Sequence, residues 1–205
     1  MERKENAVEL VGTVAGRPVE SHRGQQEIFY RFPLEISRLS GTVDCLPILC
    51  EKALLEKTEL NEGDHLLVRG ELRSYNNKSG VGNRLVLSVL AKEMLFCTGE
   101  DRNSVLLSGV LCRRPTFRTT PMGREICDMM VAVNRRYGRS DYLPCIAWGR
   151  MAEEASFWEA GTGITLAGRF QSRKYRKLLD GEETERTAYE VSVSQLALTE
   201  ELQPS

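Results

Sequence analysis

Hydrophobic and polar side chains alternate along most of this chain with a period of two, which is the pattern of half-buried β-strands. A short run of good helix formers at residues 51–60 interrupts the alternation. Gly70 lies inside one of the alternating segments and predicts a bulge or a sharp bend there. For the first half of the chain the pattern predicts strands at residues 8–14, 26–37, 42–50, 65–75 and 84–96.

The same pattern restarts in the second half of the chain. Gly12 recurs as Gly109 after 97 residues, and Gly70 recurs as Gly168 after 98 residues. A second helix is predicted at residues 151–159. An ordered series of matches with a nearly constant offset indicates an internal duplication.

Each copy is predicted to have five strands and one short helix between strands 3 and 4, which is the layout of an OB-fold barrel. We therefore predict an all-β protein with two tandem five-stranded OB-fold barrels. The predicted domains are residues 1–98, residues 103–199 and a short tail at residues 200–205.

The stretch at residues 140–150 is the strongest candidate for a binding surface. In an extended strand Tyr142 and Trp148 lie on the same face, and Arg139 and Arg150 flank them. Aromatic rings between cations suit unpaired nucleotides, because bases stack on rings and the backbone is anionic. Taken alone, the stretch also fits an ordinary barrel wall, but basic and aromatic residues alternate again at residues 134–139 and 173–177.

The second copy resembles the bacterial single-stranded DNA-binding protein family. The motifs that carry the resemblance are Ser108-Gly109-Val110 with Pro115, and residues 131–135, 141–153 and 168–175. The resemblance implies that bases stack at four aromatic positions, which are here Tyr137, Tyr142, Trp148 and Tyr175. The basic residues beside them are the candidate phosphate contacts, namely Arg135, Arg136, Arg139, Arg150, Arg173, Lys174, Arg176 and Lys177.

The first copy departs from this family pattern. Ser40, Cys45 and Glu51 stand where the second copy has Tyr137, Tyr142 and Trp148. We expect the first barrel to have largely lost its stacking face, and to serve as an assembly surface or a weak binding site. The candidates for that secondary site are Arg31, Arg73, Tyr75, Lys78 and Arg84.

No catalytic set, metal site or cofactor site is predicted. The two histidines, His22 and His65, belong to no nucleophile, metal or phosphate motif. The acidic run at residues 182–185 is predicted to be a solvated loop. The six cysteines form no C-x-x-C pair, so reduced buried thiols are predicted, with a disulfide or zinc site as the alternative. A net charge of −1 excludes a uniformly basic protein, so any nucleic-acid site must be a local one.

The predicted function is non-enzymatic, sequence-independent binding of single-stranded DNA in replication, recombination or repair. The alternative is an OB-fold protein-interaction scaffold, similar to a primosome accessory protein, with weak nucleic-acid binding. Nothing in the sequence separates DNA from RNA. Since no signal peptide or membrane span is recognised, the chain is predicted to act in the bacterial cytoplasm, associated with the nucleoid.

The family resemblance also implies an assembly. Some relatives with two barrels in one chain form dimers, so a homodimer with four barrels is expected. Replication and repair proteins are candidate partners. The family often recruits them through an acidic tail that ends in phenylalanine, and residues 199–205 do not match such a tail.

Overall fold

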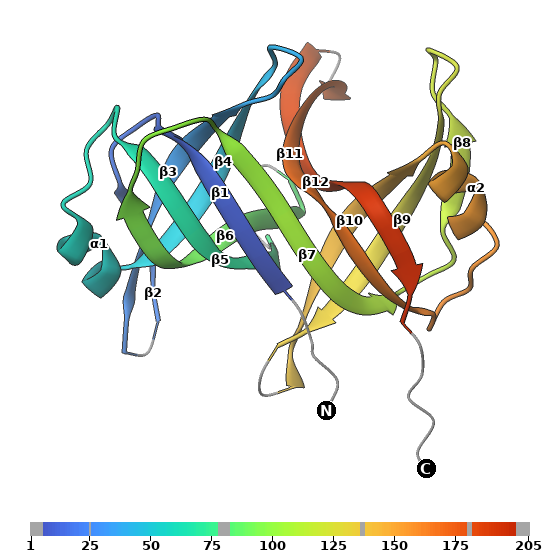
Figure 1. Ribbon diagram of the computed structural model, residues 1–205, viewed down its shortest axis with the longest axis horizontal. Helices are drawn as coiled ribbons and strands as arrows, with labels where there is room; N and C mark the ends of the chain where they lie inside the picture. Colours follow the sequence, from blue (N-terminus) through green and yellow to red (C-terminus); the bar gives the residue numbers. More distant parts are fainter. Residues whose placement is uncertain (1–5, 25, 78–82, 136–137, 180–181, 200–205) are drawn as a thin grey trace. The chain divides into compact units, whose positions relative to one another are not determined.

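The computed structural model describes residues 6–24, 26–77, 83–135, 138–179 and 182–199 of the 205-residue chain (Figure 1). The chain forms two compact units. The first unit contains residues 8–103 and 170–190, and the second contains residues 104–169 and 191–199 together with residues 6–7. The domain limits read from the sequence repeat, 1–98 and 103–199, remain a prediction.

The first barrel is a closed antiparallel sheet with one parallel contact. The strands follow the order β2-β3-β4-β6-β5-β1, and pairing of β1 with β3 closes the sheet. β4 meets β6 in parallel at Ile48↔Val89. Its elements are β1 (Asn6–Val14), β2 (Val19–Arg23), β3 (Ile28–Ser37), β4 (Val43–Glu51), α1 (Lys52–Thr58), β5 (His65–Asn76) and β6 (Leu85–Phe96).

The second barrel repeats this topology. Its order is β7-β11-β12-β10-β9-β8, closed by pairing of β7 with β9, and β10 meets β12 in parallel. Its elements are β7 (Arg102–Leu111), β8 (Thr116–Thr119), β9 (Glu125–Asn134), β10 (Ser140–Trp148), α2 (Arg150–Ala155), β11 (Gly163–Leu179) and β12 (Glu182–Leu198).

The prediction of two five-stranded OB-fold barrels is confirmed. In each barrel a helix lies between the third and fourth of the five long strands, as predicted, although both helices are shorter than the sequence pattern suggested. Each barrel also has one short strand that was not predicted, β2 or β8, whose residues are all exposed. Such a strand buries no face, so it leaves no alternating pattern to read.

The core of each barrel comes from alternate residues of its strands, as the period of two requires. Leu10, Leu34 and Ile48 are fully buried in the first barrel, and Leu107 and Leu143 in the second. Burial of side chains of this size contributes about 1.5–3 kcal/mol each. The core therefore holds the strands whose outer faces are available to ligands.

The recurring glycines mark places where two backbones come together. A Cβ on Gly70 would lie 2.1 Å from the carbonyl oxygen of Leu90, and one on Gly168 would lie 2.3 Å from that of Ser192. The pairing of β5 with β6 shifts register beside Gly70, which confirms the predicted bulge. The repeat seen in the sequence is therefore a repeat of close strand contacts.

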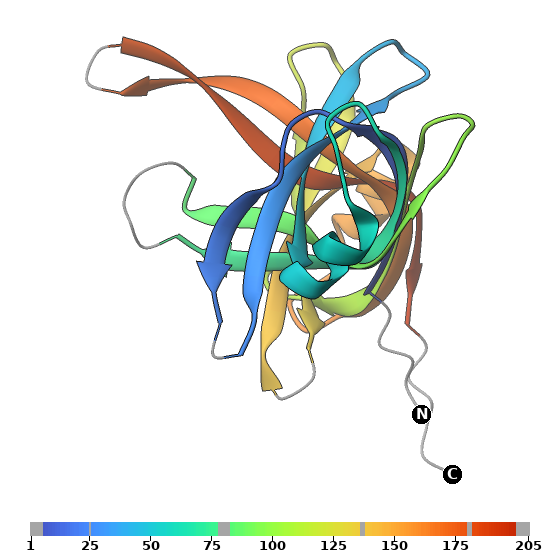
Figure 2. The ribbon, with the colours of Figure 1, turned by 90° about the vertical axis from the view of Figure 1, so that its left-hand side faces the viewer.

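β11 and β12 are longer than the equivalent strands of the first barrel, with 17 residues each against 12. Their outer halves extend as a two-stranded hairpin, seen in orange in Figure 2. We call residues 170–179 and 182–190 the arm; they belong to the first unit. The acidic run at residues 182–185 lies in β12, so its prediction as a loop was wrong.

The cysteines differ in burial, and none of them is in a disulfide. All six cysteines are free; Cys50, Cys127 and Cys145 are buried, Cys97 is half-buried, and Cys45 and Cys112 are exposed. The prediction of buried thiols therefore holds for only three of the six.

Neither helix within the described ranges is long or apolar enough to cross a membrane.

Candidate nucleic-acid interface

The outer face of β10 presents the aromatic residues that the sequence singled out. Tyr142 is 48% exposed and Trp148 is half-buried, whereas Leu143 and Ala147, on the opposite face, are fully buried. Ile146 lies between Tyr142 and Trp148 on the same face by alternation, but it is buried at 5% exposure. Two rings therefore reach the surface of the same strand, with a buried aliphatic side chain near Trp148.

A hydrogen bond holds Trp148 in place. Its indole N–H donates to Ser192 Oγ at 3.0 Å, and Ser192 is the parallel β-partner of Ile146. Because the edge of the indole is anchored to β12, its orientation is set before any ligand arrives. A preorganised ring loses less side-chain entropy when a base stacks on it.

The cations beside β10 differ in how they are held. Arg139 and Arg150 are exposed, and no ion pair to either is found in the described part of the chain. Arg135 binds the buried carboxylate of Asp141 through two hydrogen bonds, one of them from Nε at 2.7 Å. Arg136 and Tyr137 lie outside the described residues. The guanidinium of Arg135 thus has a structural partner, while those of Arg139 and Arg150 face solvent.

Three basic residues of the arm are matched by acidic residues across the hairpin. The pairs are Arg173–Glu190 at 3.6 Å, Lys174–Glu185 at 3.1 Å and Arg176–Glu183 at 3.2 Å. The two exposed pairs, Lys174–Glu185 and Arg176–Glu183, contribute about 0–1 kcal/mol each, so a phosphate can compete for these two cations. The sequence prediction missed Glu183 and Glu185 as partners because it assigned the acidic run at residues 182–185 to a loop. Lys177 lies in β11, but its side chain is outside the described part.

Tyr175 is tied to the first barrel. Its hydroxyl donates to Asn83 Oδ1 at 3.3 Å, and Asn83 Nδ2 donates to the carbonyl oxygen of Thr187 at 2.5 Å. The Arg173 guanidinium lies 5.7 Å from the centre of the Tyr175 ring, within cation–π distance. Asn83 was not recognised in the sequence, where a single asparagine beside a glycine-rich loop carries no distinctive signal.

The secondary candidates on the first barrel differ in exposure and in pairing. Arg31 and Arg84 are exposed, and Tyr75 is 58% exposed. Arg73 is paired with Glu71. Lys78 lies outside the described residues.

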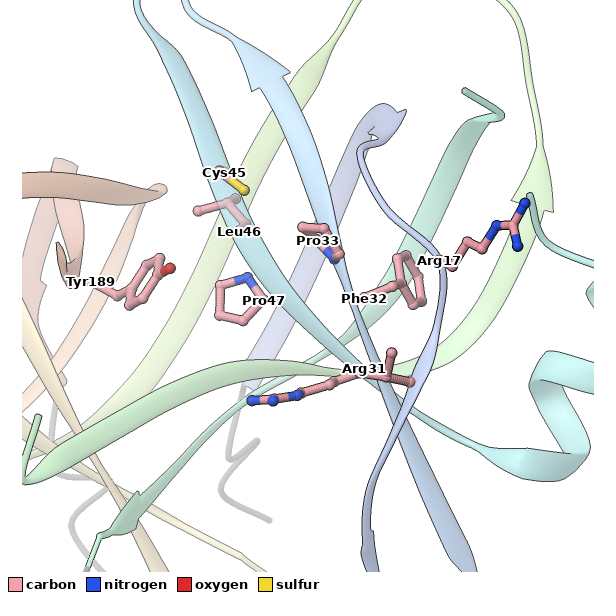
Figure 3. A pocket seen from close by; sticks show the side chains of 9 residues that line it. Arg17, Arg31, Phe32, Pro33, Cys45, Leu46, Pro47 and Tyr189 are labelled. Carbon is pink, nitrogen blue, oxygen red and sulfur yellow. The ribbon is translucent and has the colours of Figure 1, made fainter. Parts of the chain in front are cut away.

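A pocket of about 220 Å³ lies on the first barrel, between β3, β4 and the arm (Figure 3). Its lining includes Arg31, Cys45 and Pro47 from the barrel and Tyr189 from the arm. Arg17 lies at the rim. Only Arg31 of these residues was a candidate from the sequence.

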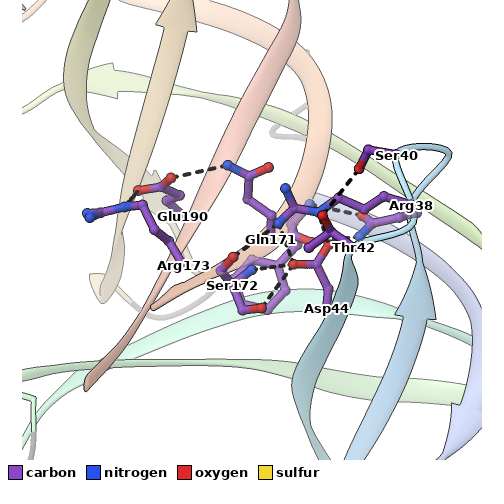
Figure 4. Close-up of polar contacts among 10 residues, drawn as sticks. Arg38, Ser40, Thr42, Asp44, Gln171, Ser172, Arg173 and Glu190 are labelled. Carbon is purple, nitrogen blue, oxygen red and sulfur yellow. Dashed lines mark hydrogen bonds and ion pairs between the residues drawn. The ribbon is translucent and has the colours of Figure 1, made fainter. Parts of the chain in front are cut away.

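Asp44 anchors the arm beside this pocket (Figure 4). It is 2% exposed and accepts hydrogen bonds from Ser172 N at 2.7 Å and from Ser172 Oγ at 2.9 Å. Arg38 binds the same carboxylate, with Nε 2.7 Å from Oδ2, and also donates to the carbonyl oxygen of Ser172 at 3.0 Å. Burial opposes ionisation of Asp44, but the hydrogen bonds from Arg38 and Ser172 outweigh it and lower its pKa. The arm is therefore attached through a buried charged network.

Two further contacts fix the base of the arm. Asn103 brackets Phe170, accepting from its backbone N–H at 2.9 Å and donating to its carbonyl oxygen at 2.6 Å. Gln171 donates to the buried carboxylate of Glu190 at 3.1 Å, as Figure 4 shows. Both strands of the arm are thus held in register next to Tyr189.

Comparison with known proteins finds similarity to single-strand binding proteins. Residues 102–199 match the model of the single-strand binding protein family. Single-stranded DNA-binding protein 2 of Streptococcus agalactiae serotype V is 35% identical over 82 residues, which are 37% of this chain and 63% of that protein. Single-stranded DNA-binding protein A of Bacillus subtilis is 35% identical over 80 residues, which are 36% of this chain and 46% of that protein. The chain spans less than two thirds of the length of these curated relatives.

A solved structure is similar over the whole chain. The single-stranded DNA binding protein from Thermus aquaticus matches with a TM-score of 0.80 and 23% identity, covering 100% of this chain and 97% of that one. At that level of identity the likeness concerns the fold. It extends to both barrels, whereas the family match is confined to residues 102–199.

Proposed function

We propose that this chain binds single-stranded DNA without sequence preference, because its residues 102–199 match the model of the single-strand binding protein family. The binding would serve DNA replication, recombination or repair. Relatives that are 35% identical carry the name single-stranded DNA-binding protein, which supports this proposal.

The observation that carries the proposal is the outer face of β10. Tyr142 presents its ring to solvent, Trp148 is oriented by Ser192, and Arg139 and Arg150 lie exposed in the segments on either side. Each base stacked on such a ring contributes about 1–3 kcal/mol, and each arginine can neutralise a phosphate. The arm adds Tyr175, Arg173, Lys174 and Arg176 as candidates, and Arg135, Arg136, Tyr137 and Lys177 remain predictions from the sequence.

The test uses Trp148 as its own reporter. The chain has two tryptophans, so Trp158→Phe leaves Trp148 as the only one. Titration with oligo-dT at low salt should quench its fluorescence, because a stacked base contacts the indole. The logarithm of affinity should fall with the logarithm of salt concentration, with a slope of about 0.7 per phosphate neutralised.

Matched variants separate stacking from folding. Tyr142→Ala should weaken binding about 5- to 150-fold, which corresponds to 1–3 kcal/mol, and Tyr142→Phe should keep most of the affinity. Duplex DNA of the same length serves as the control ligand. Unchanged fluorescence and unchanged mobility with oligo-dT at low salt would rule out the proposal.

A second candidate function is a protein-interaction scaffold with weak nucleic-acid binding. The glutamates opposite Arg173, Lys174 and Arg176 favour it, because they offset the positive charge of the arm. Capture of a protein partner that resists nuclease treatment, together with oligo-dT affinity weaker than about 100 μM, would favour this candidate over the first.

For the assembly we propose a homodimer with four barrels. Sedimentation equilibrium should then give twice the chain mass of 23.1 kDa. A mass of one chain at micromolar concentration would contradict the dimer and leave DNA binding unaffected.

We further infer that binding is not followed by catalysis, and that the protein acts in the bacterial cytoplasm in association with the nucleoid. Oligo-dT recovered at full length after prolonged incubation with Mg²⁺ is the expected result. Cell fractionation before and after nuclease treatment tests the location, since release by nuclease indicates association with DNA.

A further inference from the structure

We propose that the pocket on the first barrel is a nucleotide-binding slot whose aromatic wall is supplied by Tyr189, a residue of the arm. The sequence indicated that the first barrel had lost its stacking face, because Cys45 stands where the second barrel has Tyr142. The slot would take one base of single-stranded DNA with its phosphate. This inference rests on the proposed function and extends it to the first barrel.

The pocket on the first barrel is open because the side chain of Cys45 is small. Cys45 lies on the outer face of β4, opposite Glu35 on β3, and its side chain is exposed. The equivalent position in the second barrel carries the exposed ring of Tyr142. Loss of that ring leaves space above Pro47 and Leu46, which form the floor of the pocket.

Tyr189 supplies a ring at the edge of that space. It is half-buried, and Figure 3 shows it beside Pro47 and facing the pocket. The Tyr189 ring also lies near the ring of Phe170. The two ring centroids are 5.8 Å apart, and the two ring planes are inclined at 33° to each other. Tyr189 is therefore backed by one aromatic side chain and open to the pocket, which is the situation of a stacking platform.

Two cations give the slot its preference for an anion. Arg31 and Arg17 are exposed and line the pocket, and no ion pair to either guanidinium is found within the described ranges. Three cations of the arm, Arg173, Lys174 and Arg176, by contrast each face a glutamate. An apolar slot with Arg31 beside Pro47 and with Arg17 in its lining matches a nucleobase with its phosphate better than an apolar peptide side chain.

The position of Tyr189 is fixed by the anchor of the arm. Ser172 is bound to the buried Asp44, and Glu190, next to Tyr189, is bound by Gln171. The ring is thus held against β4 without a ligand. Such preorganisation lowers the entropy that binding would otherwise have to overcome.

The test measures how far bound oligo-dT protects Cys45, which lies in the pocket, from chemical labelling. The full-length chain is treated with N-ethylmaleimide with and without oligo-dT, and labelling is measured at each cysteine by mass spectrometry. Oligo-dT at about ten times its Kd should slow labelling of Cys45 about tenfold, because the thiol is covered in the bound state and reacts only in the free protein. Exposed Cys112, on the other barrel, reports reactivity outside the pocket.

Three variants assign the effect to the slot. Tyr189→Leu should weaken oligo-dT binding about 5- to 150-fold and abolish protection of Cys45, whereas Tyr189→Phe should keep both. Arg31→Gln should lower the salt slope by about 0.7, the value for one phosphate. The matched control is Arg69→Gln in the same barrel, whose guanidinium is already paired with Glu9 and Glu93 and which should leave the slope unchanged.

The outcomes distinguish this inference from the proposed function. If oligo-dT quenches Trp148 but Cys45 stays unprotected and Tyr189→Leu binds normally, the slot is refuted and the function of the second barrel stands. If Tyr189→Phe loses as much affinity as Tyr189→Leu, stacking is refuted as the role of the ring. If oligo-dT neither quenches Trp148 nor protects Cys45, both proposals are wrong.

Discussion

Replacing Asp44 by asparagine should detach the arm from the first barrel. Asp44 is buried, carries a negative charge and binds both Arg38 and Ser172. The asparagine side chain would keep one oxygen for the Ser172 N–H, but it would present an uncharged amide to the guanidinium of Arg38. The substitution therefore removes one partner of a buried ion pair with little change in volume.

The expected cost follows from burial. Removing one partner of a buried pair costs about 3–5 kcal/mol, because the remaining charge stays uncompensated. The Arg38 side chain keeps 21% of its surface exposed, so water can partly solvate it. We therefore expect about 3 kcal/mol, at the low end of that range.

The assay combines equilibrium and local measurements. Urea denaturation followed by circular dichroism gives the loss of unfolding free energy for Asp44→Asn. Hydrogen–deuterium exchange should lose about 150-fold protection in peptides from residues 170–179 and 182–190, since about 3 kcal/mol corresponds to that factor.

A surface pair provides the control. Asp128 pairs with Arg118, but the two side chains are 32% and 46% exposed. Asp128→Asn should cost less than about 1 kcal/mol. If Asp44→Asn costs no more than Asp128→Asn, and the arm keeps its protection, the argument from buried charge is refuted.

Other predictions follow from the close contacts and the thiols. Gly168→Ala should cost about 1–3 kcal/mol and lower the melting temperature, because the new Cβ would lie 2.3 Å from a backbone carbonyl oxygen of β12; Gly24→Ala, with nearest contacts at 3.5 Å, should be nearly neutral. Burial and then a neighbouring carboxylate raise the pKa of Cys127 to about 11, so maleimide at pH 8 should label it only after unfolding, and rapid labelling of the folded chain would contradict its burial. Because the pKa of Asp44 is lowered in the folded protein, its carboxylate stabilises the fold above the ordinary carboxyl range, and this stabilisation is lost as pH falls through the pKa of the folded state. The stability of Asp44→Asn should therefore depend less on acid below about pH 4 than that of the unsubstituted protein. Equal acid sensitivity of the two proteins would contradict this.

The barrels were predictable because their signals are local. Alternation with a period of two gives the long strands, and the offset of Gly12 to Gly109 reveals the duplication without any structure. These features depend on residues close in sequence or on the repeat itself. β2 could not be predicted in the same way, since all five of its residues are exposed.

The site was predictable only in part, because its missing elements come from distant residues. Tyr142 and Trp148 reach the surface of one strand, which the alternation anticipated. The hydrogen bond from Tyr175 to Asn83 and the placing of Tyr189 beside Cys45 join residues far apart in the chain. No local sequence pattern encodes a contact between residues so far apart. Cys45, at the position where the second barrel has Tyr142, indicates only that an aromatic ring is missing there.

Because Asp44 binds the arm, the first barrel depends on residues that are encoded in the second half of the gene. A polypeptide that ends at residue 103 would contain the first barrel without the hairpin that binds Asp44 and caps the apolar floor at Pro47. Such a half should express poorly by itself and recover when the complementary half, which carries Ser172 and Tyr189, is produced in the same cell. Reassembly from two separately encoded pieces would thus reveal, without any nucleic acid, how much each half depends on the other.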